Sequence, residues 1–220
     1  MIVAIDGPAG AGKSTIASEV AKRLGFQLID TGAMYRTVAL KALQAGVDLA
    51  DAEKLSEIAH QLHFEFAWVD GTNRIKVNGE PLGDAIRTEE VSKASSMVST
   101  HESVREALVA LQRQMGNQSD CVLEGRDIGS VVFPNAEVKI FLTASTKERA
   151  RRRAEQLKEK GETPDVSAIQ TEIENRDARD TQRSASPLVK TADAHEIDST
   201  SHSPEEIVEM VLDFARNAQS

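Results

Sequence analysis

Short apolar runs alternate with amphipathic stretches at the start of the chain. Ile2–Ile5 is apolar and rich in β-branched residues, which predicts a buried strand, and Gln27–Asp30 predicts a second. Between them, Lys13–Leu24 carries apolar residues at helical spacing and is followed by a glycine, a common helix end. The spacing over Met34–Leu43 predicts the next helix, which Gly46 stops. A strand–helix–strand–helix order is typical of a parallel α/β sheet.

The middle of the chain departs from this alternation. Two short strand-like runs, His63–Val69 and Arg74–Asn78, are separated by the turn-forming residues Asp70–Asn73, so they predict an antiparallel hairpin. A hairpin inside an alternating α/β pattern indicates an inserted lobe. The helical patterns around the hairpin cover Leu55–Leu62, Glu89–Val98 and Ser103–Met115.

The α/β alternation then resumes. Cys121–Leu123 and Val138–Leu142 predict two more strands of the sheet. Pro204–Ala218 is amphipathic, and Ser203 with Glu206 forms a capping-box pattern at its start. The remaining predicted elements are charged helices over Ser145–Lys160 and Val166–Arg183 and a final strand over Ala194–Ile197. The fold class is therefore α/β, with a parallel core sheet flanked by helices and an inserted lobe containing a small antiparallel sheet.

Composition limits the partners of this protein. The 220 residues suit one domain with inserted lobes, and 26 Lys and Arg against 35 Asp and Glu give a net charge of −9. Because the protein as a whole is negatively charged, we do not expect it to bind nucleic acid or anionic membranes through its overall charge. Any bound anion must instead be held by a local cluster of positive groups. The single cysteine, Cys121, fits a reducing compartment, and we expect a cytoplasmic monomer without a leader or membrane span.

The strongest motif is a phosphate-binding loop. Gly7-Pro8-Ala9-Gly10-Ala11-Gly12-Lys13-Ser14 matches the pattern G-x-x-x-x-G-K-[ST] without a mismatch, between a predicted strand and a predicted helix. Glycines let successive N–H groups converge on an anion, and the helix N-terminus adds positive charge. Lys13 would reach the β- and γ-phosphates, and the Ser14 hydroxyl would bind Mg²⁺. We assign this loop and Thr15 to ATP binding.

A phosphate loop does not by itself choose between a switch GTPase, a motor ATPase and a small kinase. The sequence contains no guanine-reading Asn-Lys-x-Asp segment, and a motor is usually larger. A small kinase needs a second anion site for its acceptor and a basic element that covers the γ-phosphate. Four further segments supply candidates for both.

The first candidate is Asp30-Thr31-Gly32-Ala33-Met34-Tyr35-Arg36, at the carboxyl end of the second predicted strand. This edge of an α/β sheet binds ligands, so Thr31 could contact a ribose or phosphate and Arg36 could pair with a phosphate. The alternative is that Asp30 or Thr31 only caps a helix and Arg36 is solvated.

The second candidate is Glu124-Gly125-Arg126-Asp127, which follows the strand Cys121–Leu123. An acidic residue at the end of an apolar strand occupies the position that holds Mg²⁺ or its water shell in many phosphate-loop proteins. We therefore assign Glu124, with Ser14, to the metal. Arg126 adds a phosphate donor. The alternative is an ordinary polar surface turn.

The last two candidates are basic helices. Arg176, Arg179, Asp180 and Arg183 fall on one helical face, where the guanidinium groups repel one another unless carboxylates or a bound anion neutralise them. The segment from Lys147 to Lys160 forms a positive patch that would suit a lid over ATP phosphates. Its residues assigned to ATP are Arg149 and Arg153. The alternative for both helices is a salt-bridged, solvated surface.

Taken in order along the chain, these segments resemble bacterial cytidylate (CMP) kinases. The resemblance runs from Ile2 to about Ala215 and includes Val132-Phe133-Pro134. Its most specific parts are Gly125-Arg126-Asp127-Ile128-Gly129 and Arg176-Asp177-x-Arg179-Asp180. Two positions depart from the family pattern: Glu124 replaces a frequent Asp, and Thr31 replaces a frequent Ser.

The resemblance implies a nucleoside monophosphate kinase fold that transfers a phosphoryl group from ATP to CMP or dCMP with Mg²⁺. It implies a core (1–30, 116–146 and 184–220), a monophosphate-binding lobe (31–115) and a lid (147–183). The implied roles are sugar contacts by Thr31 and Asp180, phosphate contacts by Arg36, Arg126, Arg176 and Arg183, cytosine contacts by Ser96, Arg105 and Asp127, and further CMP contacts by Tyr35 and Gly125.

The catalytic group is expected to comprise Lys13, Arg126, Arg176 and Arg183. The sequence leaves open other phosphate-loop kinases that act on UMP as well as CMP, on shikimate or on dephospho-coenzyme A. It also leaves open a nucleotide sensor without catalysis. A carboxylate such as Asp127 favours cytosine over uracil because cytosine offers an amino group where uracil offers a carbonyl.

Overall fold

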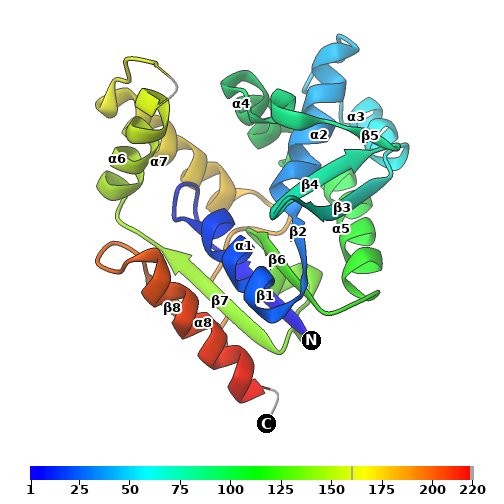
Figure 1. The fold of residues 1–220 in the computed structure, drawn as a ribbon. Coiled ribbons are helices and arrows are strands. Elements are labelled where there is room, and N and C mark those ends of the chain that lie inside the picture. Colours follow the sequence, from blue (N-terminus) through cyan, green and yellow to red (C-terminus); the bar gives the residue numbers. More distant parts are fainter. Residues whose placement is uncertain (160, 219–220) are drawn as a thin grey trace.

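The computed structural model describes residues 1–159 and 161–218. Its centre is a five-stranded, wholly parallel sheet in the order β2-β6-β1-β7-β8 (Figure 1). The strands are β1 (Ile2–Asp6), β2 (Gln27–Asp30), β6 (Cys121–Gly125), β7 (Val138–Thr143) and β8 (His195–Asp198). The predicted α/β class and parallel core sheet are confirmed.

Helices cover both faces of this sheet because its central strands are buried on both sides. Val3 and Ile5 of β1 pack into one core cluster with α1 (Lys13–Leu24) and α8 (Pro204–Ala218). Ala4, which points the opposite way, packs into the other cluster with α2 (Thr31–Gln44) and α5 (Glu102–Gly116). Alternate residues of one strand therefore supply two separate cores, as the pleat requires.

The inserted lobe contains a second sheet. Strands β3 (Phe64–Val69), β4 (Thr72–Val77) and β5 (Glu80–Pro81) pair antiparallel, and they lie beside the edge strand β2 (Figure 1). Side chains join the two sheets: the Trp68 indole donates to the Phe26 carbonyl at 3.4 Å, and the Asn73 amide donates to the Leu28 carbonyl at 3.1 Å. The lobe also holds α3 (Ala52–His60), the 3₁₀ turn η1 (Gly83–Arg87) and α4 (Glu89–Val98).

The charged helices form a pair beside the phosphate loop. Helices α6 (Thr146–Glu159) and α7 (Val166–Gln182) pack against each other (Figure 1). Lys160, the last residue of the helix predicted over 145–160, lies outside the described residues. In the described part of the chain, no helix combines the length and apolar character needed to cross a membrane.

Most predicted elements are present, with corrected ends. The limits predicted for α1, β2, α4 and α8 match the structure. The hairpin turn is tighter than predicted, with Asp70 and Gly71 alone between β3 and β4, because both adopt positive φ and reverse the chain in two residues. Arg183 lies just past the end of α7 rather than inside it, since its backbone is extended. The final strand starts and ends one residue later than predicted.

Candidate active site

The phosphate loop connects β1 to α1, and its backbone conformation requires glycine. A Cβ on Gly7 would lie 1.9 Å from the Leu142 carbonyl oxygen of β7, so no larger residue fits. Gly12 occupies the cap position of α1 with φ 97°, a left-handed conformation that favours glycine, and no side chain caps that helix. The first N–H groups of α1 therefore remain available to an anion.

Lys13 is buried beside this loop, where its Nζ donates to the Pro8 carbonyl at 2.7 Å. Burial lowers the pKa of Lys13 well below its usual range, and the positive charges of Arg126 and Arg176 lower it further. The nearby Glu124 carboxylate opposes this effect. The charged form of Lys13 is therefore disfavoured in the free protein, because burial and the nearby arginines outweigh the attraction of the nearby carboxylates.

Ser14 and Glu124 meet at the carboxyl edge of the sheet. The Ser14 hydroxyl donates to Glu124 Oε2 at 2.8 Å. Glu124 is buried at the end of β6, and burial, followed by the charge of Asp30, raises its pKa to about 7. The structure therefore brings together the two oxygen donors that the sequence assigned to the metal.

The start of α2 combines a helix cap with an ion pair. Asp30 Oδ1 accepts from the Ala33 N–H at 2.8 Å, as the capping alternative predicted, and Asp30 Oδ2 accepts from Arg36 at 2.8 Å. Arg36 is only partly exposed and is ion-paired, so the part of that alternative that expected a solvated Arg36 is wrong. The Thr31 hydroxyl donates to the Glu124 carbonyl at 2.6 Å, which ties α2 to β6.

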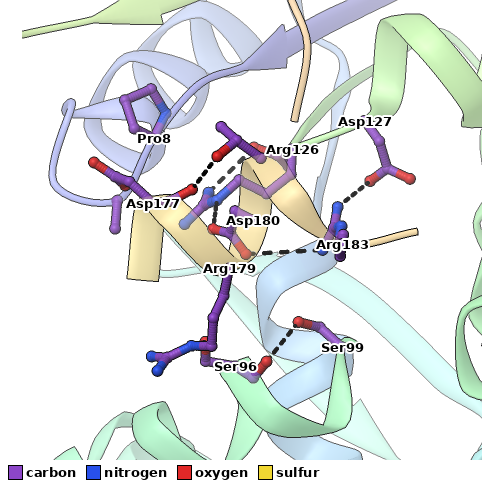
Figure 2. Close-up of polar contacts among 12 residues, drawn as sticks. Pro8, Ser96, Ser99, Arg126, Asp127, Asp177, Arg179, Asp180 and Arg183 are labelled. Atoms are coloured by element: carbon purple, nitrogen blue, oxygen red, sulfur yellow. Dashed lines mark hydrogen bonds and ion pairs between the residues drawn. The ribbon is translucent and has the colours of Figure 1, made fainter. Parts of the chain in front are cut away.

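Asp180 joins two arginines from different segments. Its Oδ2 accepts from Arg126 Nε at 2.9 Å, and its Oδ1 lies 3.8 Å from Arg183 Nη1 (Figure 2). Burial opposes ionisation of Asp180, but the charges of Arg126 and Arg176 outweigh it and hold the pKa of this carboxyl below its usual range. Asp180 is therefore a fixed anion between two guanidinium groups, one from the residue that follows β6 and one from the residue that follows α7.

Asp127 forms the second buried anion. Its carboxylate pairs with Arg105 of α5 and lies 3.9 Å from Arg183 Nη2 (Figure 2). The Arg105 guanidinium also lies over the Tyr35 ring, 5.3 Å from its centroid, and donates to the Ser99 carbonyl at 3.3 Å. Burial raises the pKa of Tyr35 to about 12, so the phenol stays neutral. Because the Ser99 hydroxyl donates to the Ser96 carbonyl at 3.0 Å, the three residues assigned to base recognition belong to one connected cluster.

Arg176 and Arg179 lie on α7 but have different surroundings. Arg176 is half-buried, its buried Nε has no hydrogen-bond partner in the described structure, and desolvation together with the charge of Arg126 lowers its pKa to about 10. Arg179 donates through Nε to the Ser96 hydroxyl of α4 at 3.2 Å (Figure 2). The sequence placed Arg179 on the same helical face but gave it no role, because spacing alone does not show which helix faces α7.

Helix α6 reaches the phosphate loop through Arg149. This buried guanidinium donates to the Ala9 carbonyl at 3.0 Å and pairs with Asp177 at 2.6 Å. Arg153, the other lid residue assigned to ATP, is half-buried and, after Lys93, contributes to lowering the pKa of Glu89 on α4. Sequence reasoning missed Arg152, which donates to the Ser199 carbonyl at 2.6 Å, while the Ser199 hydroxyl donates to Ala11 of the loop.

A phosphate loop on a parallel sheet, facing a second buried cluster of arginines, defines the class of small phosphate-loop kinases. The comparisons with known proteins identify the branch of this class. A family model described as cytidylate kinase matches residues 3–217, and the chain belongs to that family, which consists of nucleoside monophosphate kinases.

Curated relatives agree with this assignment. A cytidylate kinase of Pelotomaculum thermopropionicum is 52% identical over 211 residues, which cover 96% of this chain and 93% of the relative. A cytidylate kinase of Solibacter usitatus is 48% identical over 219 residues, covering 99% and 93%. Among solved structures, a gluconokinase from Sinorhizobium meliloti aligns with a TM-score of 0.51 at 15% identity over 99% of this chain and 93% of its own, which supports the fold alone.

Proposed function

We propose that the protein transfers the γ-phosphoryl group of ATP to CMP and dCMP, giving ADP and CDP or dCDP. The observation that carries the proposal is that the lysine of the phosphate loop lies close to the arginines of the acceptor side. Lys13 of the phosphate loop lies near enough to Arg126 and Arg176 for their charges to lower its pKa, and Arg126 is bound in turn to Asp180. The phosphates of a donor and an acceptor nucleotide, bound side by side, would neutralise the repulsion among Lys13, Arg126 and Arg176.

On the donor side, the loop from Gly7 to Ser14 and the adjoining Thr15 would bind the ATP phosphates. Lys13 would contact the transferred phosphoryl group, since its ammonium lies at the junction of the two clusters. Arg149 is already held against Ala9 of the loop, so α6 would close over the nucleotide with little change at that contact. Arg153, one helical turn after Arg149 on α6, would approach from the side that faces Glu89 of α4.

On the acceptor side, the monophosphate would lie among four arginines, and the sugar would contact Thr31 and Asp180. The base would face the cluster around Asp127, whose carboxylate would accept from the cytosine amino group. A buried site that pairs one specific group rejects a base lacking it, because a polar group is then left without a partner. The four arginines are Arg36, Arg126, Arg176 and Arg183, and the remaining acceptor-side residues are Tyr35, Ser96, Arg105 and Gly125.

The hydrogen-bonded oxygens of Ser14 and Glu124 fit a magnesium ion. Mg²⁺ prefers oxygen ligands and commonly takes one or two from the protein, with water and substrate phosphates completing its shell. The described residues contain no group of three or more His, Cys, Asp or Glu side chains placed to hold a metal. The bound ion would neutralise charge on the ATP phosphates.

The chain's own residues would then act by position and charge. In-line phosphoryl transfer needs no covalent intermediate on the protein. Lys13, Arg126, Arg176 and Arg183 would stabilise negative charge as it spreads over the transferred oxygens. We infer that the lobe at 31–115 and the lid at 147–183 close around the two nucleotides and exclude water, which would prevent loss of the phosphoryl group to hydrolysis.

A coupled assay of ADP release tests this function. The acceptors to compare, each with ATP and Mg²⁺, are CMP, dCMP, UMP, AMP, GMP, shikimate and dephospho-coenzyme A. We expect the highest kcat/KM with CMP and dCMP. Equal or better turnover of UMP, shikimate or dephospho-coenzyme A would reassign the acceptor, and tight ATP binding without turnover of any acceptor would indicate a nucleotide sensor.

A further inference from the structure

Asp6 is a buried carboxylate for which the proposed mechanism has no use. It ends β1, directly before the phosphate loop, and is 6% exposed. Its Oδ1 accepts from the Ile128 N–H at 2.8 Å and its Oδ2 from the Gly129 N–H at 2.7 Å. One carboxylate thus binds two consecutive backbone N–H groups from a segment more than a hundred positions away.

These two N–H groups begin a short helical turn, η2 (Ile128–Val132). Asp127 precedes η2 and therefore occupies its cap position, where an aspartate ordinarily accepts a hydrogen bond from the first free N–H groups. Asp127 makes no such bond. Its carboxylate instead faces Arg105 and Arg183, and only its backbone carbonyl serves η2, accepting from the Val131 N–H at 2.9 Å.

The packing around Gly129 keeps Asp6 in place. A Cβ on Gly129 would lie 3.4 Å from Asp6 Oδ2 and 3.2 Å from the Lys139 side chain, so glycine permits the close approach. Two bonds to the two oxygens of one carboxylate fix both the position and the orientation of the peptide segment. A single bond would leave that segment free to rotate about it.

We propose that Asp6 is a positioning residue that caps η2 in place of Asp127 and thereby releases the Asp127 carboxylate for base recognition. This inference rests on the proposed function, in which Asp127 reads cytosine. The N–H groups of Ile128 and Gly129 are buried, and leaving them without an acceptor is costly. If Asp6 loses its carboxylate, Asp127 is the acceptor that local geometry offers, and its side chain turns away from the substrate.

A double-mutant cycle tests this arrangement. The variants are Asp6→Ala, Asp127→Ala and the double substitution, each assayed with CMP and UMP at saturating ATP. We expect Asp6→Ala to narrow the CMP-to-UMP ratio of kcat/KM by roughly tenfold, in the direction of Asp127→Ala, because it removes the same carboxylate from the base. In the double variant the ratio should equal that of Asp127→Ala alone, while the KM for ATP stays within about twofold.

Two controls separate positioning from general loss of stability. Val211→Ala opens a cavity in the core between α8 and the sheet, on the face opposite to Asp6. It should leave the CMP-to-UMP ratio of kcat/KM unchanged. Asp6→Asn keeps the size of the side chain and one acceptor oxygen, so it should give a smaller narrowing and serves if Asp6→Ala does not fold.

An unchanged CMP-to-UMP ratio in both Asp6 variants overturns the proposal, and so do additive effects in the double variant. A raised KM for ATP with an unchanged ratio would assign Asp6 to the phosphate loop instead. The wild-type protein tests the underlying function separately: if it does not phosphorylate CMP, the proposed function fails before any variant is compared.

Discussion

The cationic side chains of the candidate site are not all paired with carboxylates. Arg126 and Arg183 approach Asp180 and Arg105 pairs with Asp127, whereas Lys13 and Arg176 form no ion pair of this kind among the described residues. Burial and mutual repulsion lower the pKa of both unpartnered groups. A free protein built in this way holds unfavourable charge that an anionic ligand neutralises.

Arg176 gives the most direct test of this balance. Arg176→Met should leave the thermal midpoint of the free protein unchanged or raise it by a few degrees, because it removes a buried cation beside Arg126. The same change should lower kcat/KM for CMP by roughly a hundredfold or more, as expected for the loss of a group that stabilises transferred phosphate charge.

The measurements for this prediction are thermal unfolding without ligand and the ADP-release assay. Arg74→Met, on the exposed surface of β4, is a matched control that should change neither. A destabilised Arg176→Met variant with full activity would show that Arg176 is part of a structural charged face.

Asp127 tests base recognition at the same scale. Asp127→Ala should reduce the preference for CMP over UMP by at least about tenfold in kcat/KM, because the acceptor for the cytosine amino group is gone. The KM for ATP should change little, since Asp127 contacts Arg105 and Arg183 rather than the phosphate loop. An unchanged preference would remove Asp127 from base reading.

At the residue scale, sequence motifs were more informative than the hydrophobic pattern. The phosphate-loop motif identified Ser14 and the strand-end position identified Glu124, and in the structure the side chains of these two residues are hydrogen-bonded. The roles assigned to individual residues stay predictions. The contact of Asp6 with Ile128 could not be foreseen, because it joins residues 122 positions apart and depends on how β1 packs beside β6.

At the scale of elements, local capping signals located several helix ends, although the start of α3, which Asp51 caps, lies three residues before the predicted one. Gly25 adopts a left-handed conformation at the end of α1, and Ser203 and Glu206 exchange hydrogen bonds at the start of α8. The elements that sequence reasoning missed are η1, β5 and η2. They are two to five residues long, too short to show a period, and their conformations depend on contacts with distant segments.

The contact between α7 and α4 carries a prediction about these elements. Arg179→Met should raise the KM for CMP and for UMP by about fivefold each, because Arg179 orients the Ser96 hydroxyl and holds α4 against α7. The KM for ATP should stay nearly constant, since α4 belongs to the inserted lobe. Steady-state kinetics with each nucleotide varied in turn will measure all three constants.

Arg151→Met is the control for this change. Arg151 lies on the exposed surface of α6 and pairs with Glu148 and Glu155 of its own helix, so its loss should affect none of these constants. Equal effects of the two substitutions would mean that Arg179 contributes only surface charge.

Over the whole molecule, a net charge of −9 surrounds a cationic site. The positive groups come from the phosphate loop, the segment after β6, α5 and α7 with the residue that follows it, which the fold brings to the carboxyl edge of the parallel sheet. The order of elements predicted this edge, the hairpin predicted an inserted lobe and the basic helix predicted a lid, but the limits of the lobe and the lid came only from the family resemblance. Their limits as moving units, and the monomeric state, stay predictions.

Ligand-linked stability tests the molecule as a unit. At a concentration about one hundred times its dissociation constant, MgATP stabilises the folded state by about 2.7 kcal/mol, which for a chain of this size corresponds to a rise of roughly 5–10 °C in the thermal midpoint. Lys13→Met should abolish most of this rise while leaving the free protein at least as stable. A full shift in Lys13→Met would place the nucleotide elsewhere.

The docking of the inserted sheet against β2 has a consequence for solubility. An edge strand offers unpaired backbone groups on which another chain can add a strand and begin aggregation. The Trp68 and Asn73 side chains donate to the backbone carbonyls of Phe26 and Leu28 along this edge, so these hydrogen bonds do not extend the sheet by another strand. Within the described structure, the lobe thus shields the β2 edge of the core sheet from strand addition, and deleting the hairpin should produce a protein prone to self-association even where the phosphate loop is intact.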